Sequence, residues 1–372
     1  MDPKHSHSSV SKHLFSISPP LLNSANPWAT SEEDLKALYN CPYTGAVTIR
    51  TSLWKAFNQH PNTHQYTFFS SSRGYATANI NVDLPEGRGE VLPGETSSLN
   101  TLGYSPIAFE EYVTMLVRMS RTSALQTKQL DKLKPFIVSV TGSAAEVGRC
   151  CEHLLEVLND PDKSYPASDK DATSSGLDLM MEINLSCPNI PDKPPPAYDG
   201  ASLTEYITAV GHAKAKTPVT YKRGLHVGIK TPPYTYQGQF QVLIDALERS
   251  TSLNGGCPIS FITATNTLGS CLVMDGKNDP ALGSANGTGI GGLAGDALHP
   301  IALGNVKTIR SLLDTSSHPD VKSISIIGIG GVSDAAGYKR MMSVGAAAVG
   351  VGTALGRDGV GIFEKITHGL EA

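Results

Sequence analysis

The stretch from Ser323 to Leu355, "SISIIGIGGVSDAAGYKRMMSVGAAAVGVGTAL", decides the fold class. It holds an apolar run over 323–331, a helical pattern over 335–345 and a second apolar run over 346–353. Both runs are nearly continuous in Ile, Val, Ala and Gly, which is typical of parallel strands buried on both faces. The stretch therefore predicts a strand-helix-strand unit, and with it a parallel sheet.

The same alternation runs through the rest of the chain. The other predicted strands are 21–25, 45–50, 136–142, 179–186, 226–231 and 260–266. Further helices are predicted over 30–40, 108–119, 144–158, 202–215, 240–250, 300–313 and 361–372, the first with Thr30 and Glu33 in capping-box spacing. Eight strands that alternate with helices predict a (β/α)8 TIM barrel. It would occupy residues 15–372 as a single domain, behind a flexible tail of residues 1–14.

A doubly wound sheet is the competing architecture. No GxGxxG motif opens a helix directly after the first predicted strand, which weighs against a Rossmann nucleotide site. Three long connections, 51–107, 187–201 and 267–299, follow predicted strands and would lie at the C-terminal face of a barrel, where such enzymes place their chemistry. The segment 159–176 precedes a strand and is predicted as a solvated loop at the opposite face.

Composition excludes several classes of protein. Of the 372 residues, 40% are hydrophobic and 17% are charged, and the net charge of −4 offers no basic surface for nucleic acid or an anionic membrane. No run approaches the roughly 18 apolar residues of a membrane span. None of the six cysteines forms a CxxC pair, and Pro61 separates His60 from His64, so no metal site is predicted. Scattered thiols suit a reducing compartment, and a cytoplasmic protein is expected.

Polar side chains stand at the ends of the predicted strands. They are Asn23, Arg50, Asn184, Lys230, Asn266 and Thr267. Asparagine offers both a donor and an acceptor, so this set suits a planar, amide-rich, anionic ligand. Glycines end the last two strands in "GIGG" (328–331) and "GVGT" (350–353). They indicate either tight turns or a phosphate site built from backbone N–H groups.

Two side chains allow opposite interpretations. Lys230 is either a solvated rim charge or a cation that stabilises negative charge on a bound ring. Cys187, in "EINLSCPNIPDKP" (182–194), is either a packed hydrophobe or a proton acceptor. Its place at the end of a barrel strand, on a long loop, favours the proton acceptor. Cys257 and Cys271 have no comparable setting and are interpreted as structural.

These motifs resemble the class 1A dihydroorotate dehydrogenases, which are cytosolic, fumarate-dependent flavoproteins of pyrimidine biosynthesis. "EINLSCPNIPDKP" resembles their active-site loop. "GIKTPPY" (228–234), "TNTLGSCLVMD" (265–275), "PIALGNVKTIR" (300–310) and the stretch 326–355 follow in the family's order. The resemblance implies a homodimeric FMN-binding barrel that oxidises dihydroorotate to orotate and passes electrons to fumarate. An NAD-linked subclass with an iron–sulfur partner subunit is the open alternative.

The resemblance also implies roles for individual residues. Cys187 is the implied catalytic base. The implied substrate-binding residues are Arg50, Asn100, Thr101, Leu102, Gly103, Tyr104, Asn184, Asn189, Asn266 and Thr267. The implied FMN-binding residues are Ser24, Ala25, Arg50, Thr51, Asn184, Lys230, Thr265, Gly295, Gly330, Gly331, Gly352 and Thr353.

The chain departs from the family pattern around the substrate. Arg50 stands where the family has lysine, "NTLGYSP" (100–106) replaces "NSMGLPN", and Asn26 and Trp28 alter the first strand's loop. Arginine is planar and bidentate, so it is not a neutral exchange for lysine. Two other hypotheses follow, a related FMN oxidoreductase that acts on another dihydro or unsaturated ring and a catalytically silent binding barrel. A dihydrouridine-synthase-like RNA enzyme is disfavoured by the acidic net charge.

Overall fold

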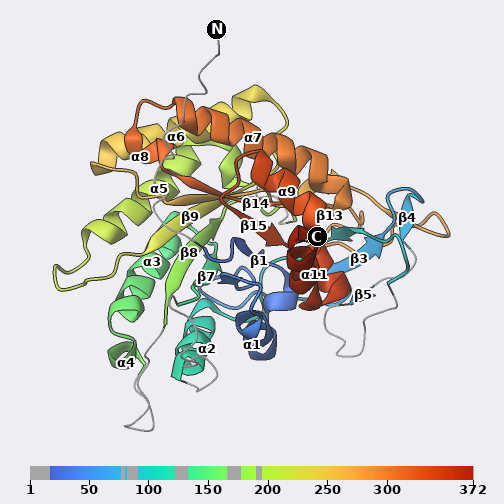
Figure 1. Ribbon diagram of the computed structural model, residues 1–372, viewed down its shortest axis with the longest axis horizontal. Helices are drawn as coiled ribbons and strands as arrows, with labels where there is room; N and C mark the ends of the chain where they lie inside the picture. The colour runs from blue at the N-terminus through green and yellow to red at the C-terminus, as the bar shows by residue number, and fades with distance from the viewer. Residues whose placement is uncertain are drawn as a thin grey trace.

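The computed structural model describes residues 17–76, 80–81, 91–121, 133–165, 177–189 and 195–371. The predicted tail of residues 1–14 and most of the predicted loop 159–176 lie outside these residues. At the centre is a barrel of parallel strands surrounded by helices (Figure 1).

The described residues contain all eight predicted barrel strands, most of them shorter than predicted. They are β1 (Leu21–Asn23), β2 (Val47–Thr48), β7 (Phe136–Val140), β8 (Leu179–Asn184), β9 (His226–Thr231), β10 (Phe261–Ala264), β14 (Ser325–Ile329) and β15 (Ala348–Val351). Their order in the sheet is β1-β15-β14-β10-β9-β8-β7-β2, and the neighbouring pairs are parallel. The prediction of a (β/α)8 barrel is confirmed, and the doubly wound sheet is excluded.

The barrel closes between β1 and the segment that leads into β2. Leu22 and Ala46 form an isolated parallel bridge. The Asn23 side chain then replaces ladder bonds, because its Nδ2 donates to the Thr48 carbonyl at 2.7 Å and its Oδ1 accepts from the Thr48 N–H at 2.9 Å. Asn23 therefore joins two strands and is turned away from the ligand site that its position predicts.

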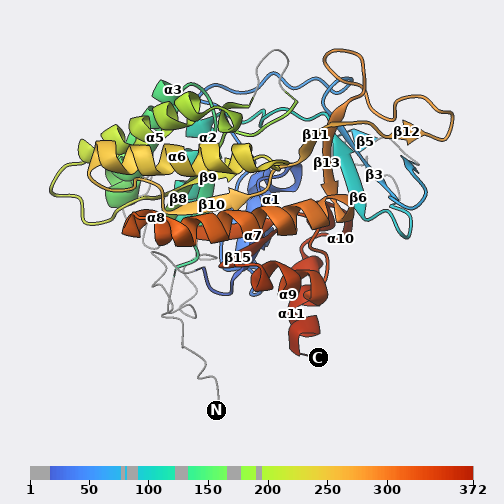
Figure 2. The same cartoon turned by 90° about the horizontal axis from the view of Figure 1, so that it is seen from above.

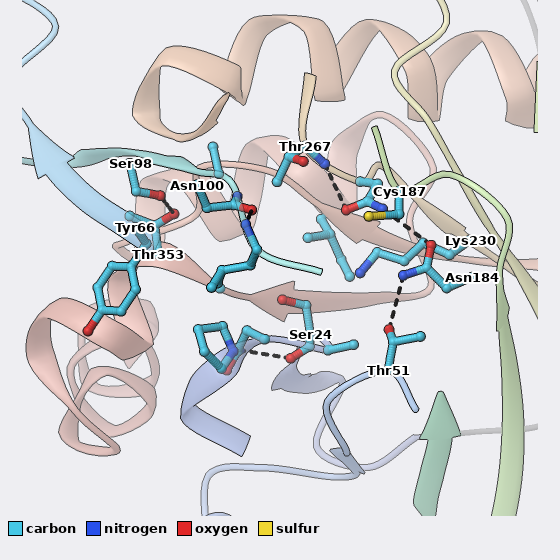
Figure 3. A pocket seen from close by; sticks show the side chains of 18 of the residues that line it. Ser24, Thr51, Tyr66, Ser98, Asn100, Asn184, Cys187, Lys230, Thr267 and Thr353 are labelled. Carbon is cyan, nitrogen blue, oxygen red and sulfur yellow. Dashed lines mark hydrogen bonds between the residues drawn. The ribbon is translucent and has the colours of Figure 1, made fainter. Parts of the chain in front are cut away.

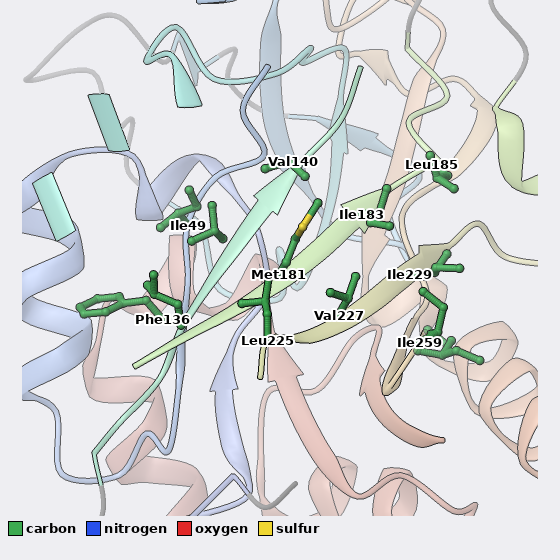
Figure 4. Close-up of a cluster of buried hydrophobic side chains, with 14 of the residues drawn as sticks. Ile49, Phe136, Val140, Met181, Ile183, Leu185, Leu225, Val227, Ile229 and Ile259 are labelled. Atoms are coloured by element: carbon green, nitrogen blue, oxygen red, sulfur yellow. The ribbon is translucent and has the colours of Figure 1, made fainter. Parts of the chain in front are cut away.

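Both faces of the barrel strands are buried, as the continuous apolar runs predict. On β8, Met181 and Ile183 belong to the large hydrophobic cluster that includes helix residues (Figure 4), and Leu179 belongs to the same cluster. Met180 belongs to a separate inner cluster with Phe261. Side chains alternate along a strand, so Glu182 and Asn184 share the inner face with Met180. The barrel interior is thus apolar at its base and polar toward the carboxyl ends of its strands.

The helices cover the outside of the barrel (Figure 2). Those in the described residues are α1 (Glu32–Asn40), α2 (Phe109–Arg121), α3 (Ala144–Asn159), α4 (Pro161–Ser164), α5 (Gly200–Ala215), α6 (Gln237–Asn254), α7 (His299–Thr315), α8 (Pro319–Lys322), α9 (Ala335–Ser343), α10 (Thr353–Asp358) and α11 (Gly361–Glu371). Short 3-10 turns span Pro27–Ala29, Pro196–Tyr198 and Asp296–Leu298.

The capping box of α1 lies one residue later than predicted. Ser31 and Asp34 form it, in place of Thr30 and Glu33. The Asp34 carboxylate accepts from the N–H groups of both Thr30 and Ser31, at 3.2 and 3.0 Å. The prediction was wrong because adjacent Ser/Thr and Glu/Asp pairs satisfy the same spacing, and only the packing of the helix selects one of them.

A second sheet lies at one end of the barrel (Figure 2). Its strands in the described residues are β3 (Gln65–Phe69), β4 (Tyr75–Ala76), β5 (Ile80–Asn81), β6 (Ser97–Asn100), β11 (Leu268–Cys271), β12 (Met274–Asp275) and β13 (Gly291–Gly295). The sequence predicts only long connections here. Three of the strands have only two residues, β6, β11 and β13 contain Gly or Ser, and β6 pairs antiparallel with the distant β13, so local periodicity does not reveal the sheet.

Candidate active site

A pocket lies at the carboxyl ends of the barrel strands, beside the second sheet, and encloses about 990 Å³ of empty space including its mouth. The predicted site residues line it, with the exception of Thr101. The Thr101 hydroxyl instead donates to the Thr63 carbonyl at 2.9 Å, and it accepts from the Gln65 N–H at 3.1 Å. Thr101 therefore connects the start of the loop 100–106 to Thr63 and Gln65 and does not line the pocket.

The two ends of the pocket differ in chemistry (Figure 3). Asn184, Cys187 and Lys230 gather at one end, whereas Ser98 and Thr353 meet at the other. The hydroxyls of Ser98 and Thr353 lie 2.9 Å apart, which ties the second sheet to the start of α10. The pocket is therefore long enough to separate a reacting group from an anchoring group.

Cys187 lies on the pocket wall, directly after β8, and is partly buried. Burial raises the pKa of its thiol above the ordinary value. The backbone N–H of Asn189, the charge on Lys230 and the Tyr104 hydroxyl offset part of this rise, and the pKa stays above the ordinary value. A thiol with this set of partners differs from Cys150, whose pKa burial raises to about 12 inside α3. Cys187 thus has the surroundings of a group that exchanges a proton.

Tyr104 connects the altered loop 100–106 to this cysteine. Burial raises the pKa of Tyr104, so its hydroxyl remains protonated and can donate. The side chains of Thr141 and Cys187 lie close enough to that hydroxyl to influence its pKa. The Tyr104 ring is held edge-on to Phe57, with centroids 5.8 Å apart. The loop residue by which this chain departs from the family pattern thus touches the predicted base.

Four of the pocket asparagines form two pairs. Asn189 Nδ2 donates to Asn100 Oδ1 at 2.9 Å. Asn266 Nδ2 donates to Asn184 Oδ1 at 3.3 Å and to Ser186 Oγ at 3.1 Å. These pairs set the amide orientations before a ligand enters, which lowers the cost of binding a ring with fixed donors and acceptors.

The two pocket cations are Lys230 and Arg50, which are only 3% and 4% exposed. Lys230 lies on β9 in register with Asn184. Arg50 directs one guanidinium nitrogen to Gln59 Oε1 at 2.9 Å. Lys230 is thus a buried pocket group and not the solvated rim charge that was the other interpretation.

The opposite end of the pocket is built from glycines. Gly331 has a φ of +68°, and a Cβ there would lie 2.6 Å from the Gly295 carbonyl oxygen. Gly295 has a φ of +76°, and a Cβ on it would lie 2.4 Å from the Thr96 oxygen. Only glycine fits such close approaches of two backbone segments. The bare backbone that results is suited to an anion such as a phosphate.

Thr265 adds a separate sign of a ligand. Its hydroxyl is buried in the pocket wall and, among the described residues, has no hydrogen-bond partner. A buried hydroxyl without a partner is costly unless a ligand satisfies it.

Several lining residues have no role in the sequence prediction. They are Pro27, Tyr66, Ser98, Pro188, Ala294, Leu298 and Ile329. Trp28 contributes to an aromatic wall with Tyr66 and Phe68, its ring stacked on Phe68 with centroids 5.9 Å apart. The aromatic and β-branched residues of "QYTFF" (65–69) are the available signal for this wall, because such residues favour strands.

The described part of the chain shows neither a helix able to span a membrane nor a group of three or more His, Cys, Asp or Glu residues that could hold a metal ion.

Comparisons with known proteins bear on the family and the fold of this chain. Residues 172–372 match the family model described as dihydroorotate dehydrogenase. The chain is 25% identical over 337 residues to the dihydroorotate dehydrogenase (fumarate) of Lachancea kluyveri, a match that covers 91% of this chain and 90% of the relative. Two structures of the Eimeria tenella DHODH, one ligand-free and one with ferulenol, have TM-scores of 0.65 and 0.64. The first covers 100% of this chain and 89% of that one at 14% identity, and the second 94% and 80% at 15% identity. The structures share the fold, and the family model spans more than half of the chain, so this protein belongs to the dihydroorotate dehydrogenase family.

Proposed function

We propose that this protein is an FMN-dependent enzyme that oxidises dihydroorotate to orotate, with Cys187 as the base. The observation that carries the proposal is the meeting of Cys187, Lys230 and Arg50 with the asparagine pairs in one pocket. The chain's family and its fumarate-dependent relative support the same substrate and oxidant.

The pocket's own residues fit FMN. The glycine-lined end at Gly295 and Gly331 suits the phosphate, the Thr265 hydroxyl needs a partner, and Lys230 supplies a buried cation for the ring system. FMN bound there would supply the acceptor for the hydride that leaves the substrate. These residues would hold the cofactor, and the apolar wall at Leu298 and Ile329 would exclude water from it.

The chain itself supplies the proton chemistry. The Cys187 thiolate would take the proton from the dihydroorotate carbon next to the ring carbonyl, and the thiol would form. Lys230 and Arg50 favour both the thiolate and an anionic substrate. The asparagine amides would orient the ring so that this carbon faces the sulfur.

Direct reduction tests the proposal. The purified FMN-loaded protein, mixed anaerobically with dihydroorotate, is expected to lose its oxidised flavin absorbance, and fumarate is expected to restore it. A flavin that stays oxidised with dihydroorotate would contradict the proposed substrate. Reduction by another dihydro ring in the same assay would then favour the related oxidoreductase.

Removal of the Tyr104 hydroxyl tests its contact with Cys187. The base must lose its proton to act, so flavin reduction is expected to accelerate as pH rises through the pKa of Cys187. Tyr104→Phe removes a hydroxyl that lowers this pKa, and the midpoint should move upward by about one pH unit. Tyr206→Phe is the control, because that hydroxyl donates to the Gly142 carbonyl at 2.6 Å, outside the pocket lining. An unchanged midpoint in Tyr104→Phe would contradict the contact.

We further propose that residues 15–372 act as one FMN-binding domain in a cytoplasmic homodimer. The family resemblance supports this assembly. Sedimentation of the purified protein would test it.

A further inference from the structure

A buried carboxylate lies beneath the candidate site and is not used by the proposed chemistry. Glu182 is 2% exposed and sits on the inner face of β8, one inward position below Asn184. Burial of a carboxyl group is unfavourable unless hydrogen bonds compensate for it. Its Oε1 accepts from Ser139 Oγ at 2.7 Å, across the β7–β8 register in which the two residues are paired.

A continuous hydrogen-bonded chain connects this carboxylate with the pocket. Ser139 Oγ lies 2.9 Å from Thr51 Oγ1, and Asn184 Nδ2 donates to Thr51 Oγ1 at 3.0 Å. Figure 3 shows the last of these bonds, at the pocket wall. Asn184 and Thr51 line the pocket, whereas Ser139 and Glu182 lie below it. We name these four residues, Asn184, Thr51, Ser139 and Glu182, the amide-orienting chain.

The direction of every donor in this chain is determined by its end. A carboxylate only accepts, so the single Ser139 hydroxyl proton points to Glu182. Ser139 must then accept from Thr51, and the Thr51 hydroxyl must accept from the amide of Asn184. The buried carboxylate thereby favours the orientation in which the nitrogen side of the Asn184 amide faces Thr51.

The other side of the Asn184 amide agrees with this orientation. Its Oδ1 accepts from the Ser186 N–H at 3.2 Å and from Asn266 Nδ2 at 3.3 Å. One Nδ2 hydrogen is used by Thr51, so the second is the group that Asn184 offers to a ligand. Asn184 therefore presents a donor to the pocket, suited to a carbonyl oxygen or an unprotonated ring nitrogen of the bound ring system.

We propose that Glu182 is a positioning residue, which acts through Ser139 and Thr51 to hold the Asn184 amide with its N–H group toward the bound FMN. The inference rests on the proposed function only in taking FMN as the ligand. It does not depend on which ring the enzyme oxidises. A glutamine at position 182 can donate as well as accept, so it removes the directional constraint while it preserves size.

The positioning role of the amide-orienting chain is tested by the affinity of the apoprotein for FMN, which is measured by quenching of flavin fluorescence. Glu182→Gln and Ser139→Ala are each expected to weaken FMN binding by about tenfold, the scale of one hydrogen bond to a ligand. The double variant Glu182→Gln/Ser139→Ala is expected to bind FMN no more weakly than Ser139→Ala alone. The Ser139→Ala substitution already interrupts the hydrogen bonds of the amide-orienting chain. Thermal unfolding of each variant reports whether the barrel remains folded.

Ser52→Ala is the matched control. Ser52 is also fully buried, and its hydroxyl donates to the Ser139 backbone carbonyl at 3.4 Å. It therefore lies beside the amide-orienting chain but is not part of it. Its FMN affinity is expected to equal that of the wild type. Equal losses in Ser52→Ala would show a general packing effect and would overturn the proposal. A Glu182→Gln effect that persists in the Ser139→Ala background would show action by charge through space, and would also overturn it.

The same samples separate this inference from the proposed substrate. If dihydroorotate does not reduce the wild-type flavin, the substrate assignment fails, while the FMN affinities still decide the role of Glu182. If the wild type is reduced and the single variants bind FMN as tightly as the wild type, the positioning role is refuted and the proposed function stands.

Discussion

Replacement of Cys187 by alanine is expected to slow flavin reduction by dihydroorotate by about 10²-fold or more, the usual scale for the loss of a general base. The effect should fall on the rate of reduction and spare FMN binding, because Cys187 is proposed to act on the substrate and is not among the residues that would hold the cofactor. Anaerobic rapid mixing, followed by flavin absorbance, measures this rate directly.

Cys271→Ala is the control for removal of a thiol. Cys271 is also partly buried, but it lies on β11 and does not line the pocket. The flavin of the Cys271→Ala variant should be reduced by dihydroorotate at the wild-type rate. A Cys187→Ala enzyme that is reduced at the wild-type rate would exclude the cysteine as the base, even if dihydroorotate proves to be the substrate.

The second large effect is expected for Gly331→Ala on FMN affinity. The new Cβ would lie 2.6 Å from the Gly295 carbonyl oxygen and 2.8 Å from His299 Cβ, so the loop must move. Displacement of N–H groups from a phosphate costs about 1.5–3 kcal/mol for each hydrogen bond to a charged group. The loss of one or two such bonds would weaken FMN binding by about 10²-fold. Titration of the apoprotein with FMN provides the measurement.

Gly359→Ala separates the clash from backbone strain. Gly359 has the same φ of +68°, but a Cβ there meets no atom within 4 Å. Both variants place alanine in a left-handed conformation, and only Gly331→Ala forces two backbone segments apart. Equal FMN affinities for the two variants would contradict a phosphate site at Gly331.

Arg50 and Tyr104 are two pocket residues at which this chain departs from the family pattern. Arg50 is buried, lines the pocket and is oriented by Gln59, so its planar guanidinium has a defined direction. The Tyr104 hydroxyl lowers the pKa of the Cys187 thiol. Two of the three departures noted in the sequence therefore bear on the proposed substrate site and the proposed base. The third, at Asn26 and Trp28, contributes to the pocket wall beside Tyr66 and Phe68.

The barrel and much of the pocket could be predicted from the sequence. A strand buried on both faces must be apolar at nearly every position. The eight apolar runs can therefore be recognised in the sequence without knowledge of the strands that pair with them. The alternation of strands with helices then requires parallel pairing, which collects the residues at the carboxyl ends at one face. Asn184, Lys230 and Asn266 are brought together by this rule alone.

Asn23 shows where such prediction fails. It stands at a strand end like Asn184, yet its amide bridges to Thr48 because the sheet needs closure there. The second sheet is not predicted from the sequence for a related reason. Its strands are short, and they are stabilised by partners far away in the chain, such as β6 with β13. Tyr66 and Ser98 enter the pocket only through that sheet.

The sequence by itself determined the barrel, the pocket's face and the candidate residues, because periodicity and strand ends are local properties. Only the tertiary structure decided how those residues act. Whether Lys230 is solvated, which amides pair, and that Glu182 is connected to Asn184 through Ser139 and Thr51 all depend on contacts between separate strands. Hydrogen bonds and burial are properties of such contacts, and no pattern along one strand specifies the neighbour that completes them.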